Sequence, residues 1–144
     1  MRGLMMGSLS RNKGRSGEQE IVRILKDELG LGIAVTRNYA QQAHTGGVDV
    51  LGVPGWAIEV KRAKQFSEGW WTQTAEQAAR VGDQPVLLYR LDRKRWRAKC
   101  CGCSVGLHHF QFEMDLMDWI TIVREQISDA FDETTLLRTK PAAL

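Results

Sequence analysis

The sequence predicts an α/β fold, in which helices cover a central β-sheet. Segments with the apolar spacing of amphipathic helices occur at about residues 17–29, 67–81 and 115–128. Shorter segments with strand character occur at residues 33–37, 48–52, 57–61 and 85–90. The helix over 67–81 connects one strand to the next, and such a connection is typical of an α/β sheet.

The first helix is expected to follow a mobile basic arm. Residues 1–15 contain Gly, Ser and Asn together with four basic side chains and no acidic one. Ser16 and Gln19 have the spacing of a capping box, and apolar residues then recur at helical intervals up to Gly30. At 100° per residue, Glu18 falls at the centre of the apolar stripe, so its carboxylate is expected to point inward.

A β-hairpin is expected around Pro54-Gly55, after a strand over 33–37 and a polar loop over 38–47. Proline and glycine supply the turn chemistry between the two hairpin strands. The connection is expected to have three or five residues, or to include a β-bulge.

The register of this hairpin follows from its apolar pattern. Val48 and Val50 should face the alternate apolar residues of the second strand, which requires that opposed residue numbers sum to 108. Asp49 then lies opposite Glu59, and Lys61 projects to the same side of the sheet. The register therefore predicts that two carboxylates and one ammonium group lie on the same face of the hairpin.

The rest of the chain is expected to complete one domain. The helix over 67–81 ends at Gly82, and the strand over 85–90 has the nearly continuous apolar pattern of a strand buried on both faces. A charged turn over 92–95 leads to an extended segment over 96–99, and the pattern does not determine the structure of residues 103–114. We expect an arm over 1–15, a folded domain over 16–130 and a mobile tail over 131–144.

Composition limits the class of protein. No segment approaches 18 consecutive apolar residues, and the first residues lack the apolar stretch of a signal peptide. We therefore expect a cytoplasmic protein without a membrane span. Cys100, Cys101 and Cys103 are crowded into four positions, unlike a secreted disulfide framework, so they are expected to be reduced. Zinc binding with the nearby histidines is disfavoured, because two of the cysteines are adjacent.

Charge is unevenly distributed along the chain. Residues 1–109 carry 17 basic and 10 acidic side chains, a balance of +7, whereas residues 110–144 carry 3 and 7, a balance of −4. A basic body favours a polyanionic partner such as nucleic acid. The alternative is a charged surface that only meets solvent.

Asp49, Glu59, Lys61 and the inward-pointing Glu18 form a candidate active site. Carboxylates held close together repel one another unless a divalent cation neutralises them, and oxygen ligands suit Mg²⁺ or Mn²⁺. Such a cation lowers the pKa of a bound water and stabilises negative charge on a phosphate, while Lys61 can orient or deprotonate that water. The alternative is an ordinary edge hairpin with a solvated polar face. The combination of groups within a basic body favours phosphodiester hydrolysis.

Over roughly residues 13–97 the sequence resembles the PD-(D/E)XK nucleases and, within them, the archaeal-type Holliday junction resolvases, which some phages also have. Glu18 opens a helix after Lys13-Gly14, as in that family, although Gln19 replaces a basic residue that often follows this glutamate. The other landmarks that match in order and spacing are Ala34–Arg37, Val48-Asp49-Val50, Ile58-Glu59-Val60-Lys61, Gln84–Leu88 and Trp96-Arg97.

The resemblance implies a restriction-endonuclease-like mixed sheet flanked by helices. It also implies that Asp49, Glu59 and the carbonyl of Val60 bind Mg²⁺ or Mn²⁺, that Lys61 is the catalytic lysine, and that Glu18 completes the acidic site. A four-way DNA junction would be the substrate and a homodimer the active form, because paired cuts need two active sites related by two-fold symmetry. No membrane and no small-molecule cofactor is implied, and a phage-encoded protein would act in the host cytoplasm.

Further side chains are candidates for DNA contact. Basic residues recur beside the second hairpin strand and around Trp96, where edge-strand protection is the alternative to phosphate contact. An amide on the helix over 67–81 could hold a water or phosphate, whereas Trp70 and Trp71 are expected to pack rather than to stack on bases. The candidates are Arg15, Arg62, Lys64, Gln73, Arg95 and Arg97, and the resemblance implies Arg37 as well, because it matches a strand arginine that the family uses near the junction backbone.

Three functions remain open at this point. The first is a metal-dependent endonuclease that resolves four-way junctions by paired symmetric nicks. The second is a nicking or restriction-like nuclease on duplex or flapped DNA. The third is a branched-DNA-binding module without activity, in which the acidic cluster only orders the fold.

Overall fold

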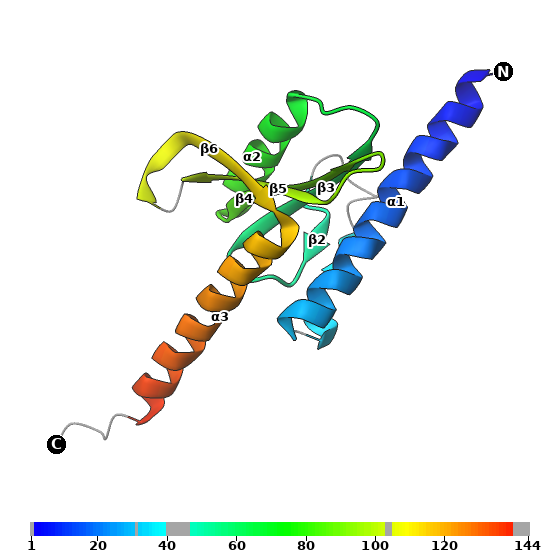
Figure 1. Ribbon diagram of the computed structural model, residues 1–144. Coiled ribbons are helices and arrows are strands. Elements are labelled where there is room, and N and C mark those ends of the chain that lie inside the picture. Colours follow the sequence, from blue (N-terminus) through cyan, green and yellow to red (C-terminus); the bar gives the residue numbers. More distant parts are fainter. Residues whose placement is uncertain (1, 31, 40–46, 103–104, 140–144) are drawn as a thin grey trace.

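Six strands form one sheet in the order β1-β2-β3-β4-β5-β6. The computed structural model describes residues 2–30, 32–39, 47–102 and 105–139. Helices α1 (Arg2–Leu29) and α3 (Leu116–Thr139) lie on one face of the sheet, and α2 (Gly69–Val81) lies on the other (Figure 1). The strands are β1 (Thr36–Arg37), β2 (Val50–Leu51), β3 (Trp56–Ala63), β4 (Gln84–Leu91), β5 (Arg97–Gly102) and β6 (Leu107–Asp115). The predicted α/β fold, with helices flanking a mixed sheet, is confirmed.

The centre of the sheet is the parallel pair β3 and β4, which α2 connects. The two strands pair along their whole length, from Trp56 opposite Gln84 to Ala63 opposite Leu91. The other neighbouring strands are antiparallel. The helix ends as predicted at Gly82, which has φ 74° and donates its N–H to the carbonyl of Ala78. Burial of β4 on both faces explains its continuous apolar sequence.

The predicted hairpin register is confirmed, because Val50 lies opposite Ile58. The turn is closed by a hydrogen bond from the Trp56 N–H to the Val53 carbonyl at 3.3 Å. Strand β2 is shorter than the predicted segment over 48–52. Val48 packs against Ala57 and the α2 residue Ala78, whereas Val50 belongs to the opposite face, so the expectation that both valines share a face is wrong.

Helix α1 is longer than the sequence pattern indicates. The predicted start near residue 17 is wrong, because residues 2–15 contain no proline and continue the same helix back to Arg2. Gly17 lies within α1 against β3, where a Cβ atom would come 2.9 Å from Cγ and Cδ of Arg62. Gly17 therefore permits a close approach between α1 and β3. The division into arm, domain and tail stays a prediction.

Three other boundaries also differ from the sequence prediction. The segment over 33–37 is a short 3-10 helix (Gly32–Ala34) followed by β1, so only its end is a strand. Helix α3 continues past residue 128 to Thr139, and residues 107–115 form β6, which the apolar pattern left undetermined. No helix in the described part of the chain is long and apolar enough to cross a membrane.

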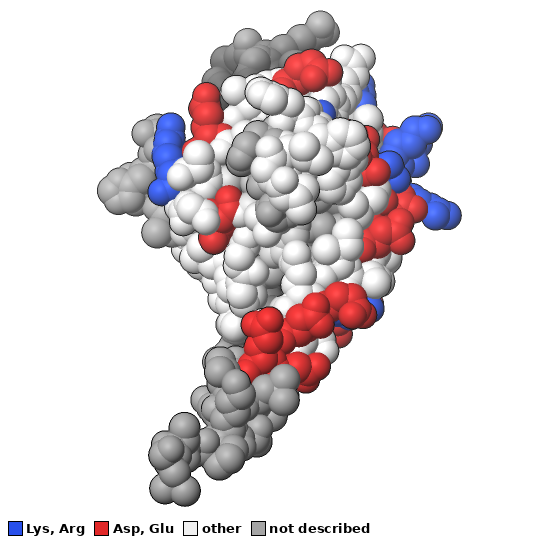
Figure 2. Space-filling view, turned by 90° about the vertical axis from the view of Figure 1, so that its left-hand side faces the viewer, with Lys and Arg blue, Asp and Glu red and all other residues white. Residues whose placement is uncertain are grey.

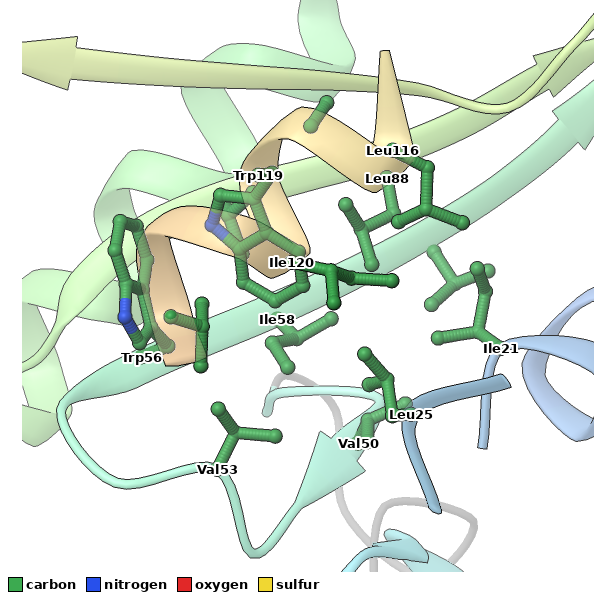
Figure 3. Close-up of a cluster of buried hydrophobic side chains, with 14 of the residues drawn as sticks. Ile21, Leu25, Val50, Val53, Trp56, Ile58, Leu88, Leu116, Trp119 and Ile120 are labelled. Carbon is green, nitrogen blue, oxygen red and sulfur yellow. The ribbon is translucent and has the colours of Figure 1, made fainter. Parts of the chain in front are cut away.

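The larger core lies between the sheet and the pair α1 and α3 (Figure 3). Ile21 and Leu25 of α1 and Trp119 of α3 are fully buried there. Trp119 meets Trp56 edge to face, with ring centroids 5.5 Å apart and an interplanar angle of 86°. This contact packs α3 against β3. Burial of an aliphatic side chain such as Ile21 or Leu25 contributes about 1.5 to 3 kcal/mol and holds α1 to the same face of the sheet.

The smaller core lies under α2. Trp71 packs there with Leu87 and Tyr89, while Trp70 is half-buried and contacts Phe66 at a ring-centroid distance of 5.2 Å. These contacts agree with the expectation that both tryptophans pack. Glu59 and Lys61 of β3 alternate with Ile58 and Val60, which face α1 and α3, so the two charged side chains lie on the α2 side.

The cysteines differ from expectation at one position. Cys100 is a buried free thiol, and burial raises the pKa of this group to about 12. Cys101 is disulfide-bonded, so the expectation of three reduced cysteines is wrong for this residue. A rule about secreted frameworks does not exclude an isolated disulfide. Cys103 lies outside the described residues.

Candidate active site

A cleft of about 510 Å³ opens between α1, the hairpin strands and the first turns of α2. It contains each of the four side chains that the sequence predicts as catalytic. Its walls are formed by Gly14, Glu18, Arg37, Asn38, Asp49, Glu59, Val60, Lys61, Arg62, Ala63, Trp70 and Gln73.

Asp49 lies directly before β2 and is hydrogen-bonded to β3. Its N–H donates to the carbonyl of Ile58 at 2.8 Å, and its carboxylate Oδ2 accepts a hydrogen bond from the N–H of Val60 at 2.7 Å. The carboxylate therefore replaces a backbone carbonyl as the partner of β3. Asp49 is only 5% exposed, so its side chain is enclosed as well as hydrogen-bonded beside β3.

Glu59 is buried more deeply, with an exposed fraction of 2%. Its Oε1 lies 3.3 Å from Nζ of Lys61, which is half-buried at the edge of the cleft. Its Oε2 is buried without a hydrogen-bond donor from the described residues. A buried carboxylate oxygen without a donor is costly unless a proton or a cation satisfies it.

The electrostatic environment opposes the ionised form of Glu59. Burial, and after it the negative charge of Asp49, raise the pKa of this carboxyl group to about 8, although Lys61 acts in the opposite direction. An acid with this environment holds a proton at neutral pH when no other positive charge is present. A shifted pKa in a cleft is typical of a functional site.

The pair Asp49 and Glu59 fits a divalent cation. Both groups are hard oxygen donors, and the oxygen of Glu59 without a partner would gain one. The described residues contain no group of three or more His, Cys, Asp or Glu side chains placed to hold a metal. A site with two carboxylates still suits Mg²⁺, which is usually bound through one or two carboxylates and otherwise through water and substrate oxygens.

Glu18 reaches the same cleft from α1, as the helical pattern predicts, but its carboxylate is bound to Arg37. Nε and Nη2 of Arg37 donate to Oε2 of Glu18 at 2.9 and 2.7 Å. Both side chains are largely buried, so the pair links α1 to β1. Glu18 as a further member of the acidic site stays a prediction.

The stability of the metal-free protein is expected to depend on pH through Glu59. The folded protein holds a proton on this group up to pH of about 8, whereas an ordinary glutamate has a pKa of 4.5. The contribution of Glu59 to the free energy of unfolding is therefore fully present below pH of about 4.5 and is lost as pH rises from there through the folded-state pKa of about 8. The melting temperature recorded in EDTA should therefore fall between pH of about 4.5 and about 8. In Glu59→Gln, which has no carboxyl group at this position, the melting temperature should fall less over the same pH interval. An equal decline in that variant would contradict the assignment.

The structure divides the predicted DNA contacts into two groups. Arg37, Arg62 and Gln73 line the cleft. The other four residues are not part of its walls: Arg97 donates to Asp115 at 2.7 Å, and Arg15, Lys64 and Arg95 are exposed. These four side chains stay predicted contacts for DNA that extends beyond the cleft.

Sequence reasoning did not assign a role to Asn38 in the cleft. Its Nδ2 donates to the carbonyl of Val48 at 2.9 Å, and its N–H donates to the carbonyl of Asp49. Asn38 therefore positions the segment that carries Asp49. Its place directly after Arg37 at the start of a polar loop was the available signal. Trp70 is a second unassigned wall residue, since its pattern predicts packing alone.

Comparisons with known proteins extend this description. A family model described as phage putative PDDEXK endonuclease matches residues 9–100, which include all the walls of the cleft. No curated protein matches the chain. Among solved structures, the chain is similar to Archaeoglobus fulgidus Hjc, a Holliday junction resolvase from an archaeal hyperthermophile. The two are 21% identical, the match covers 73% of this chain and 85% of that chain, and the TM-score is 0.45.

Proposed function

The chain belongs to the phage putative PDDEXK endonuclease family, and from this premise we propose that it is a metal-dependent DNA endonuclease that cuts four-way junctions. The observation that carries the proposal is the buried pair Asp49 and Glu59 beside Lys61 in a cleft. A pair of buried carboxylates next to an ammonium group suits phosphodiester hydrolysis better than a structural role, because it costs stability unless it binds a ligand.

In this proposal, Asp49, Glu59 and the Val60 carbonyl would hold Mg²⁺ or Mn²⁺. When bound, the cation supplies positive charge to the phosphate under attack and lowers the pKa of a water molecule. Asp49 is already oriented by the Val60 N–H, so little rearrangement precedes binding.

Two basic residues of β3 would act on the substrate. Lys61 projects toward Glu59 and can orient the attacking water as an ammonium group, or accept its proton when the lysine is in its neutral amine form. Arg62 lines the cleft beside Gly17 of α1 and can contact a phosphate oxygen. Gln73, on the first turns of α2, can hold a water or a second phosphate oxygen.

Pairing of two protomers would place two such sites on one junction. Figure 2 shows the side of the molecule with β6 and α3, where neutral side chains fill the middle and acidic ones gather over α3. Exposed apolar side chains of this region include Phe110 of β6 and Met117 of α3. Because phosphates avoid an acidic surface, this side supports a contact between protomers rather than with DNA.

Purified protein is expected to nick a synthetic four-way junction in Mg²⁺, at symmetric positions on opposing strands. The linear duplex of the same sequence should stay intact, and EDTA should stop the reaction, because the carboxylate pair needs the cation. Denaturing gels of end-labelled strands measure both outcomes. Cleavage of duplex or flapped DNA at the same rate would favour a nicking or restriction-like nuclease, and binding without cleavage would favour a DNA-binding module. A strictly monomeric mass in solution would contradict the paired arrangement.

A further inference from the structure

A second hollow, of about 370 Å³, adjoins the active-site cleft and lies between α1 and the segment of β1 and Tyr39. Arg37 lines both spaces, so the surface of the cleft continues directly into this hollow. Its other walls include Arg23 and Lys26 of α1 and Tyr39, which follows β1. None of these three residues belongs to the contacts predicted from the sequence.

Tyr39 offers an aromatic ring to the solvent. The residue is 66% exposed, and Cζ of Arg37 lies 5.3 Å from the centroid of its ring. The guanidinium group thus supports the ring from one side, and the same guanidinium is fixed by its bonds to Glu18. A supported and exposed ring next to a nuclease cleft is a platform on which a nucleobase can stack.

The walls of the hollow also carry positive charge. Arg23 and Lys26 are three residues apart on α1, so they lie on neighbouring positions of one helix face. Within the described residues neither forms an ion pair. Asp27 is the acidic residue among the walls, so Arg23 and Lys26 outnumber it even without Arg37, whose charge is paired with Glu18. Phosphate groups are the ligands that such side chains bind most readily.

We propose that this hollow binds an unpaired nucleotide of the DNA strand that leaves the active-site cleft. Tyr39 stacks on the base, and Arg23 and Lys26 hold the adjoining phosphates. The volume suits a ligand of nucleotide size. This inference rests on the proposed function, because it assigns the second space to the same DNA substrate.

The test measures binding in Ca²⁺ by fluorescence anisotropy, with a duplex that carries one unpaired arm and a blunt duplex of equal length. Tyr39→Ala should weaken binding of the armed duplex by about tenfold, because one stacked base contributes about 1 to 3 kcal/mol. Binding of the blunt duplex should not change. Tyr39→Phe keeps the ring and should bind the armed duplex like the parent protein.

Arg23→Ala gives an independent measurement of the phosphate contact. Its affinity for the armed duplex should depend less steeply on salt, with a slope reduced by about 1. The matched control is Arg80→Ala, which removes an exposed arginine from α2, outside both spaces, and should leave the slope unchanged.

The outcomes separate this inference from the proposed function. If Tyr39→Ala weakens both duplexes equally or neither of them, and Arg23→Ala behaves like Arg80→Ala, the nucleotide site is wrong even in a protein that cuts junctions. If the parent protein cuts no DNA in Mg²⁺, the proposed endonuclease is wrong, whereas a selective loss of armed-duplex binding in Tyr39→Ala would still support the nucleotide site.

Discussion

Glu59→Gln is expected to lower the rate of junction cleavage by about 10³-fold or more in saturating Mg²⁺. The substitution removes one of the two buried carboxylates that would hold the cation, and it keeps the size of the side chain. Because Glu59 holds a proton in the metal-free protein, a neutral amide should be accommodated without loss of folding. Single-turnover cleavage and a thermal melt in EDTA measure the two effects separately.

Glu76→Gln is the matched control for this prediction. It makes the same chemical change on an exposed position of α2 and should leave cleavage unchanged. The double variant Asp49→Asn/Glu59→Gln should lose little more activity than either single variant, because the two carboxylates act on one site. A Glu59→Gln protein that cuts as fast as its parent would remove the basis of the site assignment.

Gly52→Ala is expected to have the largest effect on stability. Gly52 has φ +100°, and a Cβ atom there would lie 1.7 Å from the carbonyl oxygen of Ala34. The backbone strain costs about 1 to 3 kcal/mol, and relief of the overlap requires movement of the hairpin away from the segment before β1. A total loss above about 4 kcal/mol is a large part of the 5 to 15 kcal/mol that stabilises a typical domain. Chemical denaturation measures this loss.

Gly55→Ala measures the cost of backbone strain without a steric overlap. Gly55 has φ +80°, but no atom lies within 4 Å of the position of an added Cβ. This variant should therefore lose only the strain contribution of about 1 to 3 kcal/mol. If Gly52→Ala and Gly55→Ala lose the same free energy of unfolding, the steric overlap with the Ala34 carbonyl does not destabilise Gly52→Ala.

The fold could be predicted from the sequence where the burial of a segment determines the spacing of its apolar residues. Strand β4 is apolar at successive positions because both of its faces are covered, and α2 has a clear end at Gly82. Strand β6 could not be predicted, because this edge strand leaves Leu107 and Phe110 exposed and so lacks a buried alternation. The start of α1 could not be predicted, because a capping pattern inside a longer helix has the same sequence as one at its beginning.

The candidate site was predictable to the extent that it depends on hairpin register. Asp49 and Glu59 are brought together by local pairing, so the apolar pattern was sufficient to place them. Helical periodicity gave the direction of Glu18 but not its partner Arg37, which lies 19 residues away. The hollow beside Tyr39 has no sequence signature, because it depends on how β1 lies against α1.

Every pair of neighbouring strands in the sheet is also consecutive in the chain. A polypeptide with this order can add each strand to the edge of the preceding one as it leaves the ribosome, without waiting for a distant segment. The hairpin that carries Asp49 and Glu59 is synthesised before α3, which supplies Trp119 to the larger core. The acidic pair can thus assemble during translation before α3 covers the opposite face of the sheet.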